Sequence, residues 1–180
     1  MSAIVADDIL ALESFLPYRL NRLADAVSRE FAGTYRDRHG LTRPEWRVFA
    51  TLGQFGTMTA TAIGAHSAMH KTKVSRAVVA LEQRKWLMRT PDASDRRIEH
   101  LALTKAGVTA YREMVPLAKA FEKELLRRLK RAQATALMEG LTALEAGLLG
   151  SGAASAPGTA HQSITTLPEL PLFMASKPSR

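Results

Sequence analysis

At 180 residues, the chain is long enough for one packed domain, or for one domain with an appendage. It contains no cysteine, which excludes disulfides, thiolate metal sites and sensing by thiol oxidation, and fits a reducing cytoplasm. No apolar run reaches the roughly 20 residues of a membrane-spanning helix, and the N-terminus carries acids where a secretory signal carries positive charge. We therefore expect a cytoplasmic protein without a membrane partner.

The net charge of +8 is concentrated in one part of the chain. Residues 70–97 contain eight Lys or Arg against three Asp or Glu, whereas the first 40 residues nearly balance. A local basic patch of this kind suits a polyanion such as nucleic acid, and a solvated basic face has the same composition. The charge alone leaves both interpretations open.

Two helices are predicted before the basic patch. Apolar residues repeat at helical spacing over residues 12–31, and Pro17 places the start of the first main helix near residues 15–17. Gly40 ends this pattern. The segment TRPE at residues 42–45 is typical of a capping box that opens a second helix, and GQFG at residues 53–56 is expected to form a turn.

A helix-turn-helix arrangement is predicted next. Thr59 can cap a short helix over residues 60–66, residues 67–69 form a turn, and the segment HKTKVSRAVVALEQRKW forms an amphipathic helix. The apolar face of this helix consists of Val74, Ala77, Val78 and Leu81, at i, i+3, i+4 and i+7. Its opposite face carries Lys71, Thr72, Lys73, Ser75 and Arg76.

The following segment predicts a two-stranded ribbon with a charged tip. Strands are expected over residues 86–90 and 98–103, around a turn that carries Asp95, Arg96 and Arg97. A ribbon directly after a recognition helix is a wing, and the narrow, negative minor groove of DNA attracts arginine. We expect Asp95 to pair with one guanidinium and support the tip, which leaves the other arginine to face DNA.

Two more helices are predicted after the ribbon. Thr104 opens a long helix to about residue 129, and another helix covers about residues 132–149. Their apolar positions exceed what one lobe could cover, which favours burial against a partner subunit. Residues 151–180 are rich in Ser, Ala, Pro and Gly, and we expect a largely disordered tail, or alternatively a docking motif at LPELPLF.

The segments KTKVSRAVVALEQR and DASDRRIEHLALTKAG, in this order, resemble the MarR family of winged-helix transcriptional regulators. That family typically shows a T-V-S-R-like recognition helix, a D-x-x-D-R-R wing and an L-T-x-x-G start to the next helix. LPYRLNRLADAVSR and LTRPEWRVFATL also resemble its first two helices, so the resemblance covers about residues 10–149.

The resemblance implies a mainly α (α+β minor) fold, in which a winged helix-turn-helix DNA-binding lobe is joined to N- and C-terminal dimerisation helices. The domains expected are the N-terminal dimerisation region 1–40, the DNA-binding lobe 41–104, the C-terminal dimerisation helices 105–150 and the tail 151–180. The function implied is that of a homodimeric repressor on a pseudo-palindromic operator of double-stranded DNA, with recognition helices about 34–36 Å apart.

The resemblance also assigns DNA contacts residue by residue. The recognition-helix positions that reach bases and phosphates are matched by Thr72, Lys73, Ser75 and Arg76, a further phosphate contact is expected from Lys71, and the wing-tip pair is matched by Arg96 and Arg97. Arg76 has the alternative role of pairing with an acid of its own chain. Ser94 stands where many members have an arginine, which leaves open which wing arginine enters the groove. Lys85 replaces a usual glycine, so we expect a slightly altered helix end.

Control by a small, possibly aromatic or anionic, effector is a further implication of the resemblance. Residues that could line a crevice between the dimer helices and the winged lobe are Tyr18, Arg22, Trp46, Phe49, Met69, His70 and Tyr111. Aromatic walls with a cation suit an aromatic acid or a related anion. The alternative is that these side chains pack the core and the dimer interface.

Other functional classes find little support in the sequence. No cofactor or metal is expected, because His66 and His70 straddle a predicted turn and need not share a face. No glycine-rich phosphate loop, G-x-S-x-G or metal-ligand motif is present, so the protein is not expected to be an enzyme. The alternative function is a winged-helix protein that binds DNA non-specifically or mediates protein contacts, but Thr72 and Ser75 among the basic residues favour base reading.

Overall fold

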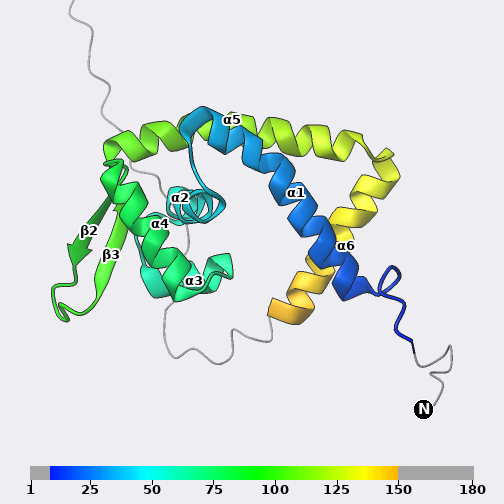
Figure 1. The fold of residues 1–180 in the computed structure, drawn as a ribbon, viewed down its shortest axis with the longest axis horizontal. Coiled ribbons are helices and arrows are strands. Elements are labelled where there is room, and N and C mark those ends of the chain that lie inside the picture. Colours follow the sequence, from blue (N-terminus) through cyan, green and yellow to red (C-terminus); the bar gives the residue numbers. More distant parts are fainter. Residues whose placement is uncertain (1–8, 150–180) are drawn as a thin grey trace, which may run out of the picture. The chain divides into compact units, whose positions relative to one another are not determined.

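The computed structural model describes residues 9–149, so the predicted tail 151–180 lies outside the described residues. The described residues separate into two compact units, one that ends at residue 129 and one that begins at residue 130. The first unit contains α1 (Leu16–His39), α2 (Arg43–Phe55), β1 (Met58–Thr59), α3 (Ala60–Ser67), α4 (Lys71–Gln83), β2 (Leu87–Pro91), β3 (Glu99–Leu103) and α5 (Lys105–Arg127), and the second contains α6 (Arg131–Leu149) (Figure 1). The mainly α fold is confirmed. None of the described helices is both long and apolar enough to cross a membrane.

Capping residues mark three of the helix starts. The Thr42 N–H donates to the Glu45 carboxylate at 3.1 Å before α2. The Thr59 hydroxyl accepts from the N–H three residues on at 3.2 Å, and the Thr104 hydroxyl accepts from the Gly107 N–H at 3.1 Å. These bonds satisfy backbone N–H groups that a helix start leaves without partners. The starts predicted at these threonines are confirmed.

The predicted turn at residues 53–56 is wrong in its first half. Helix α2 continues to Phe55, and the backbone leaves the helix at Gly56, where φ is 74°. Gly53 lies inside the helix against the ring of Tyr111 on α5, and a Cβ at Gly53 would lie 2.3 Å from the ring atom Cε2. The glycine therefore permits a close approach of α5.

The sheet has three antiparallel strands in the order β1-β3-β2. The two predicted strands are β2 and β3, with Leu87 opposite Leu103 and Pro91 opposite Glu99. β1, which pairs Met58 with Leu101, was not predicted because two residues are too few to show an alternating pattern.

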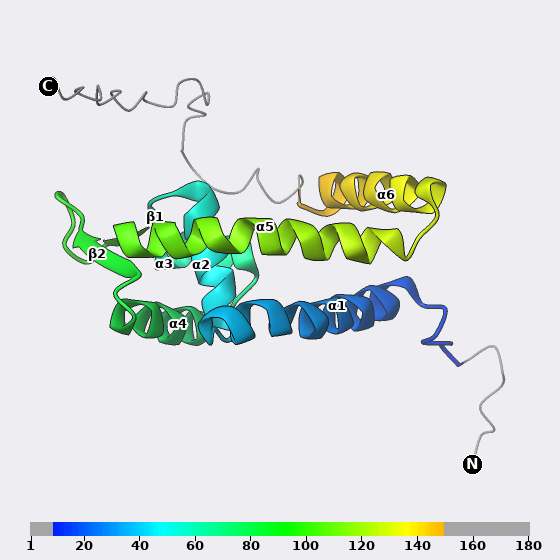
Figure 2. The same cartoon turned by 90° about the horizontal axis from the view of Figure 1, so that it is seen from above.

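The core of the first unit lies where α2, α4 and the sheet meet. The predicted apolar face of α4 is buried, and it packs with Tyr35, Leu41, Val48, Phe49, Leu52, Ile63, Leu87, Leu101, Ala110 and Met114. α5 packs against both α1 and α2 (Figure 2). Figure 1 shows α4 and the ribbon of β2 and β3 at the end of this unit that lies away from the start of α1.

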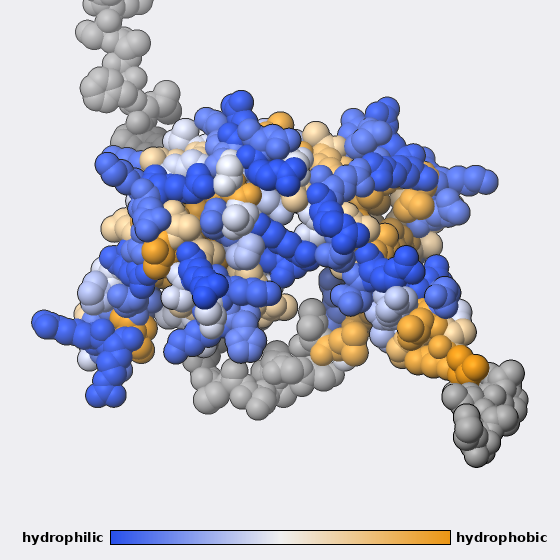
Figure 3. All heavy atoms as spheres, viewed as in Figure 1, coloured by the Kyte–Doolittle hydropathy of each residue, from blue (hydrophilic) through white to orange (hydrophobic). Residues whose placement is uncertain are grey.

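Large apolar side chains remain exposed near the start of α1. They are Ile9, Leu10, Leu12, Phe15, Leu16, Leu20 and Leu23, and Figure 3 shows hydrophobic atoms gathered where the described chain begins. Helix α6, described by itself, exposes Leu137, Met138, Leu144 and Leu148. Exposed apolar surface of this extent marks a site of interaction.

Candidate nucleic-acid interface

The polar and basic residues of α4 lie on the face opposite the core. Lys71, Thr72, Lys73, Ser75 and Arg76 are all exposed, whereas the four residues of the predicted apolar face of the same helix are at most 3% exposed. Within residues 9–149, Lys71, Lys73 and Arg76 make no ion pair, and the alternative acid partner of Arg76 is not found there. These cations are therefore free to meet an anionic surface.

Asp92, which was not predicted from the sequence, organises the turn of the wing. Its Oδ1 accepts from the Ser94 N–H at 2.8 Å, from the Ser94 hydroxyl at 2.6 Å and from the Asp95 N–H at 3.1 Å. Its Oδ2 lies 2.8 Å from His100 Nε2 on β3. The Ser94 hydroxyl and, next, His100 hold the pKa of this carboxyl well below its usual range. An aspartate followed two residues later by serine is a turn signal that could have identified it.

The arginines of the wing tip differ in their contacts. Arg97 donates its backbone N–H to Asp95 Oδ1 at 3.0 Å, and its Nε lies 3.9 Å from the same oxygen. The Arg97 side chain is 94% exposed, so this ion pair is weak. Arg96 is exposed and has no ion pair among residues 9–149. Figure 3 shows the hydrophilic tip projecting from the molecule.

Arg89 on β2 ties the wing to α4. Its Nε and Nη2 donate to the two carboxylate oxygens of Glu82 on α4 at 2.8 and 2.7 Å, and its Nη1 donates to Glu99 on β3 at 2.8 Å. The hydrogen bonds to Glu82 and then Glu99 raise the pKa of Arg89. Because paired charge-assisted bonds to a planar guanidinium fix its orientation, this Arg89 clamp holds the wing at a set position relative to α4.

The end of α4 has a regular hydrogen-bond pattern, although a lysine replaces the usual glycine. Lys85 adopts the left-handed conformation, with φ at 61°. Its N–H donates to the Glu82 carbonyl at 2.7 Å, and the Trp86 N–H donates to the Leu81 carbonyl at 3.0 Å. These two bonds form a Schellman motif. The altered helix end expected from the sequence is therefore confined to backbone strain at Lys85.

The segment LTKAG joins the wing to α5 by a close backbone contact. The Thr104 N–H donates to the Trp86 carbonyl at 3.0 Å, and the Thr104 hydroxyl donates to the Lys85 carbonyl at 2.7 Å. A Cβ on Gly107 would lie 2.2 Å from the Trp86 carbonyl oxygen. Only glycine fits at this position without a shift of the backbone.

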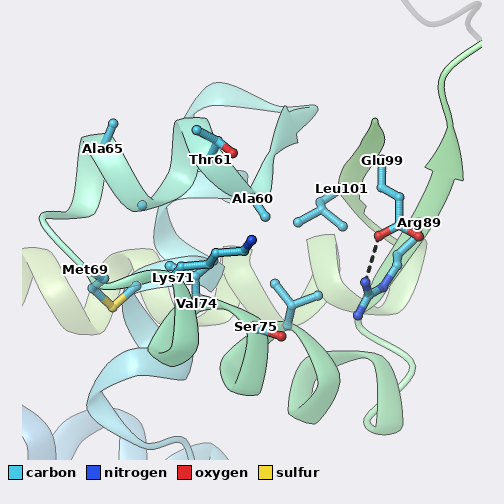
Figure 4. A pocket seen from close by; sticks show the side chains of 12 residues that line it. Ala60, Thr61, Ala65, Met69, Lys71, Val74, Ser75, Arg89, Glu99 and Leu101 are labelled. Carbon is cyan, nitrogen blue, oxygen red and sulfur yellow. Dashed lines mark hydrogen bonds and ion pairs between the residues drawn. The ribbon is translucent and has the colours of Figure 1, made fainter. Parts of the chain in front are cut away.

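A cavity of about 440 Å³ lies between α3, α4 and the wing (Figure 4). Its walls include Met69 and Leu101, and the Arg89–Glu99 ion pair borders it. Lys71 and Ser75 also line this wing-side cavity, so two of the residues assigned to DNA lie at its edge.

The seven residues predicted to line a ligand crevice lie in three separate places in the fold. Tyr18 and Arg22 lie on α1, where the Arg22 guanidinium is 5.7 Å from the centre of the Tyr18 ring. Arg22 also lines a shallow surface hollow with other residues of α1, among them Leu20 and Leu23.

The second group lies in the core and the third in the turn before α4. Phe49 is fully buried, with its ring centre 6.4 Å from that of Trp46 and 5.9 Å from that of Tyr111. Met69 and His70 line a cavity of about 250 Å³ beside α2. Phe49 therefore packs in the core, which was the alternative to ligand binding expected for these residues.

The sequence and the structure are similar to those of known transcriptional regulators. Residues 41–98 match the MarR family profile. The HTH-type transcriptional regulator YwoH of Bacillus subtilis is 28% identical over 111 residues, which cover 62% of this chain and 80% of YwoH. A MarR family regulator from Silicibacter pomeroyi has a similar structure, with a TM-score of 0.64 and 26% identity over 76% of this chain and 91% of that chain.

Two further solved structures share the fold. BpsR of Bordetella bronchiseptica, solved in a study of how 6-hydroxynicotinic acid regulates its DNA binding, has a TM-score of 0.66 and 23% identity, over 76% of this chain and 97% of that chain. FabT of Streptococcus pneumoniae, solved in complex with DNA, has a TM-score of 0.62 and 20% identity, over 76% and 96%. The protein is a DNA-binding transcriptional regulator and not an enzyme. Its residues 41–98 match the MarR family, and its described residues share the winged helix-turn-helix fold of that family's regulators.

Proposed function

We propose that the protein is a homodimeric, cytoplasmic repressor that binds a pseudo-palindromic operator and responds to a small aromatic or anionic ligand. The observation that carries this proposal is the set of exposed cations on α4 and at the wing tip that make no ion pair with any described residue. The Arg89 clamp holds these two elements in a fixed arrangement. The DNA complex of FabT and the control of BpsR by 6-hydroxynicotinic acid support the DNA and ligand parts.

On DNA, α4 enters the major groove and the wing reaches the neighbouring minor groove. Thr72, Ser75 and Arg76 read base edges, and the lysines at positions 71 and 73 contact phosphates. Arg96 enters the minor groove, since it lacks the carboxylate contact that Arg97 has with Asp95. The Arg89 clamp keeps the spacing that lets both elements bind together.

The dimer is supported by the exposed apolar residues before and on α1 and on α6. A second copy that covers these surfaces removes them from water, which is favourable by about 25 cal/mol per Å² of apolar area. A two-fold axis then sets the two α4 helices about one turn of DNA apart, roughly 34–36 Å.

Fluorescence anisotropy on duplex DNA from upstream of the protein's own gene tests this function. A scrambled duplex and a salt series run beside it, and we expect the native duplex to bind at least about 10³-fold more tightly. Arg76→Ala and the double change Arg96→Ala, Arg97→Ala should abolish specific binding, with the dimer intact by size-exclusion chromatography. Arg38→Ala, an exposed arginine that pairs with Glu113, is the control and should bind like the wild type.

Equal affinity for both duplexes, falling steeply with salt, would favour the alternative function of non-specific DNA binding. A reporter driven by the bound promoter distinguishes repression from activation. Expression should rise when the gene for the protein is deleted, and a fall would show an activator.

A further inference from the structure

We propose that the outer face of α5 binds the phosphate backbone of a second DNA duplex, so that the protein holds two DNA segments at once. This face carries four exposed cations, Lys105, Arg112, Lys119 and Lys123, which we call the α5 stripe. Operator binding by α4 and the wing does not use this surface, so the inference goes beyond the proposed function. The stripe contacts phosphates and reads no base sequence.

The cations of the α5 stripe lie on one side of the helix. Because successive residues of an α-helix are turned by about 100°, the members of the stripe fall within about 40° of one another around the helix axis. The buried residues of α5, Gly107, Ala110 and Met114, lie on the opposite side. The stripe therefore points away from the core.

The α5 stripe and the exposed face of α4 point in opposite directions. Both helices turn their apolar faces toward the same core, since Met114 of α5 belongs to one buried cluster with Val74 and Leu81 of α4. Figure 1 shows α5 above α2, with α3 and α4 below, and Figure 2 shows α5 crossing over α2 and α3. A duplex bound to α4 therefore leaves the stripe free to bind another duplex.

The charge of the α5 stripe is not neutralised by the described part of the chain. None of its four members makes an ion pair within residues 9–149. Two acids of α5 lie to either side of the core and the stripe, and they have other partners. The Glu113 carboxylate lies 3.6 Å from Arg38, and the Glu124 carboxylate lies 3.4 Å from Arg127. The stripe therefore keeps its positive charge, which attracts a polyanion.

The positions of these cations are unfavourable for α5 on its own. Lys105 lies in the first turn, where the helix dipole disfavours a cation, and that turn contains no acid. Lys119 and Lys123 are four positions apart, a spacing at which like charges destabilise a helix. Helix stability therefore does not explain these three residues, and bound phosphates would relieve both unfavourable interactions.

The length of the α5 stripe suits double-stranded DNA. From Lys105 to Lys123 the helix rises about 27 Å, at about 1.5 Å per residue. The same length of duplex carries about 16 phosphates, at one per about 1.7 Å of its axis. A small anion would contact only one or two members of the stripe, since neighbouring members are about 6–11 Å apart along the helix. A duplex can contact all four.

Capture of a second duplex by protein that is already bound to DNA tests the proposal. The upstream duplex is fixed to beads and saturated with the full-length protein, free protein is washed away, and a fluorescent scrambled duplex is added. We expect the wild type to capture the scrambled duplex. The affinity of capture should fall about 10²-fold between about 50 and about 200 mM salt, because each of four phosphate contacts contributes a slope of about −0.9.

The double change Arg112→Gln, Lys119→Gln should weaken capture at least about tenfold and reduce the salt slope by about two, because two phosphate contacts are lost. Its affinity for the upstream duplex should equal that of the wild type. The matched control, Arg36→Gln with Arg38→Gln, removes the same charge from α1, where each arginine pairs with an acid, and should capture normally. No capture by the wild type, or an equal loss in the control, would overturn the proposal.

Lysine-specific labelling followed by mass spectrometry locates the second duplex on the protein. An equimolar amount of the upstream duplex should protect Lys71 and Lys73, and added scrambled duplex should also protect Lys105, Lys119 and Lys123. Unchanged labelling of these α5 lysines, or their protection only by vesicles of an anionic lipid, would sink the inference and leave the proposed function standing. Protection of the α5 lysines by DNA without specific binding of the upstream duplex would support the inference and contradict the proposed function.

Discussion

Replacing Lys85 with glycine is expected to stabilise the protein. Lys85 has φ at 61°, in the left-handed region, where a residue with a Cβ loses roughly 1–2 kcal/mol relative to the right-handed region. Glycine removes this strain but gives the unfolded chain more freedom, which costs about 0.4–1 kcal/mol. The net gain is about 0.5–1 kcal/mol, because the backbone bonds of the Schellman motif do not depend on the side chain.

The gain is measured by thermal unfolding at one protein concentration, since the unfolding temperature of a dimer depends on concentration. It should appear as a rise of about 1–4 °C for a chain of this size. Gln83→Gly, two positions earlier and still helical, is the matched control and should destabilise by about 1 kcal/mol. Lys85→Ala should have little effect, because alanine keeps the Cβ. A fall in stability for Lys85→Gly would refute the assignment of strain at this position.

Two other predictions concern the wing and the partly buried His39. Asp92→Ala should weaken specific DNA binding roughly tenfold, which is the effect of losing one good protein–DNA contact. Asp95→Ala should weaken it less, because Asp92 accepts three of the hydrogen bonds of the turn. Fluorescence anisotropy measures both affinities, and a larger loss for Asp95→Ala would contradict the role given to Asp92. Burial lowers the pKa of His39, so only the unfolded chain takes up a proton near the ordinary value of about 6.5. Stability is therefore full above that pH and falls as the pH is lowered through it, and His39→Gln should reduce the loss of unfolding temperature between about pH 7.5 and about 5.5. An equal loss in both proteins would show that other groups cause it.

Local signals in the sequence predict most of the elements. The threonines that open α2, α3 and α5 are followed by helical apolar spacing, and the buried face of α4 follows from its i, i+3, i+4, i+7 pattern. Both kinds of signal depend on residues a few positions apart, so one chain suffices to recognise them. The misplaced turn at Gly53 shows the limit, since a glycine required by a distant ring has the same appearance in sequence as a glycine required by a turn.

The contacts that hold the candidate site together depend on residues far apart in the chain. Arg89 bonds to Glu82 and Glu99 on two other elements, and Arg84 bonds to carbonyls more than forty positions away. Their partners depend on how the elements pack, which composition and spacing do not determine. The buried hydroxyl of Tyr35, which has no hydrogen-bond partner among the described residues, could not be predicted for the same reason, because its surroundings depend on the packing.

The Arg89 clamp has a consequence for how relatives of this protein could diverge. Its members are Glu82, Arg89 and Glu99, and none of the residues assigned to base reading takes part in it. Substitutions at Thr72, Ser75 or Arg76 therefore leave the spacing between helix and wing intact. A new operator preference can arise by single substitutions on the exposed face of α4, while the three residues of the Arg89 clamp stay the same and continue to hold the wing at its position relative to α4.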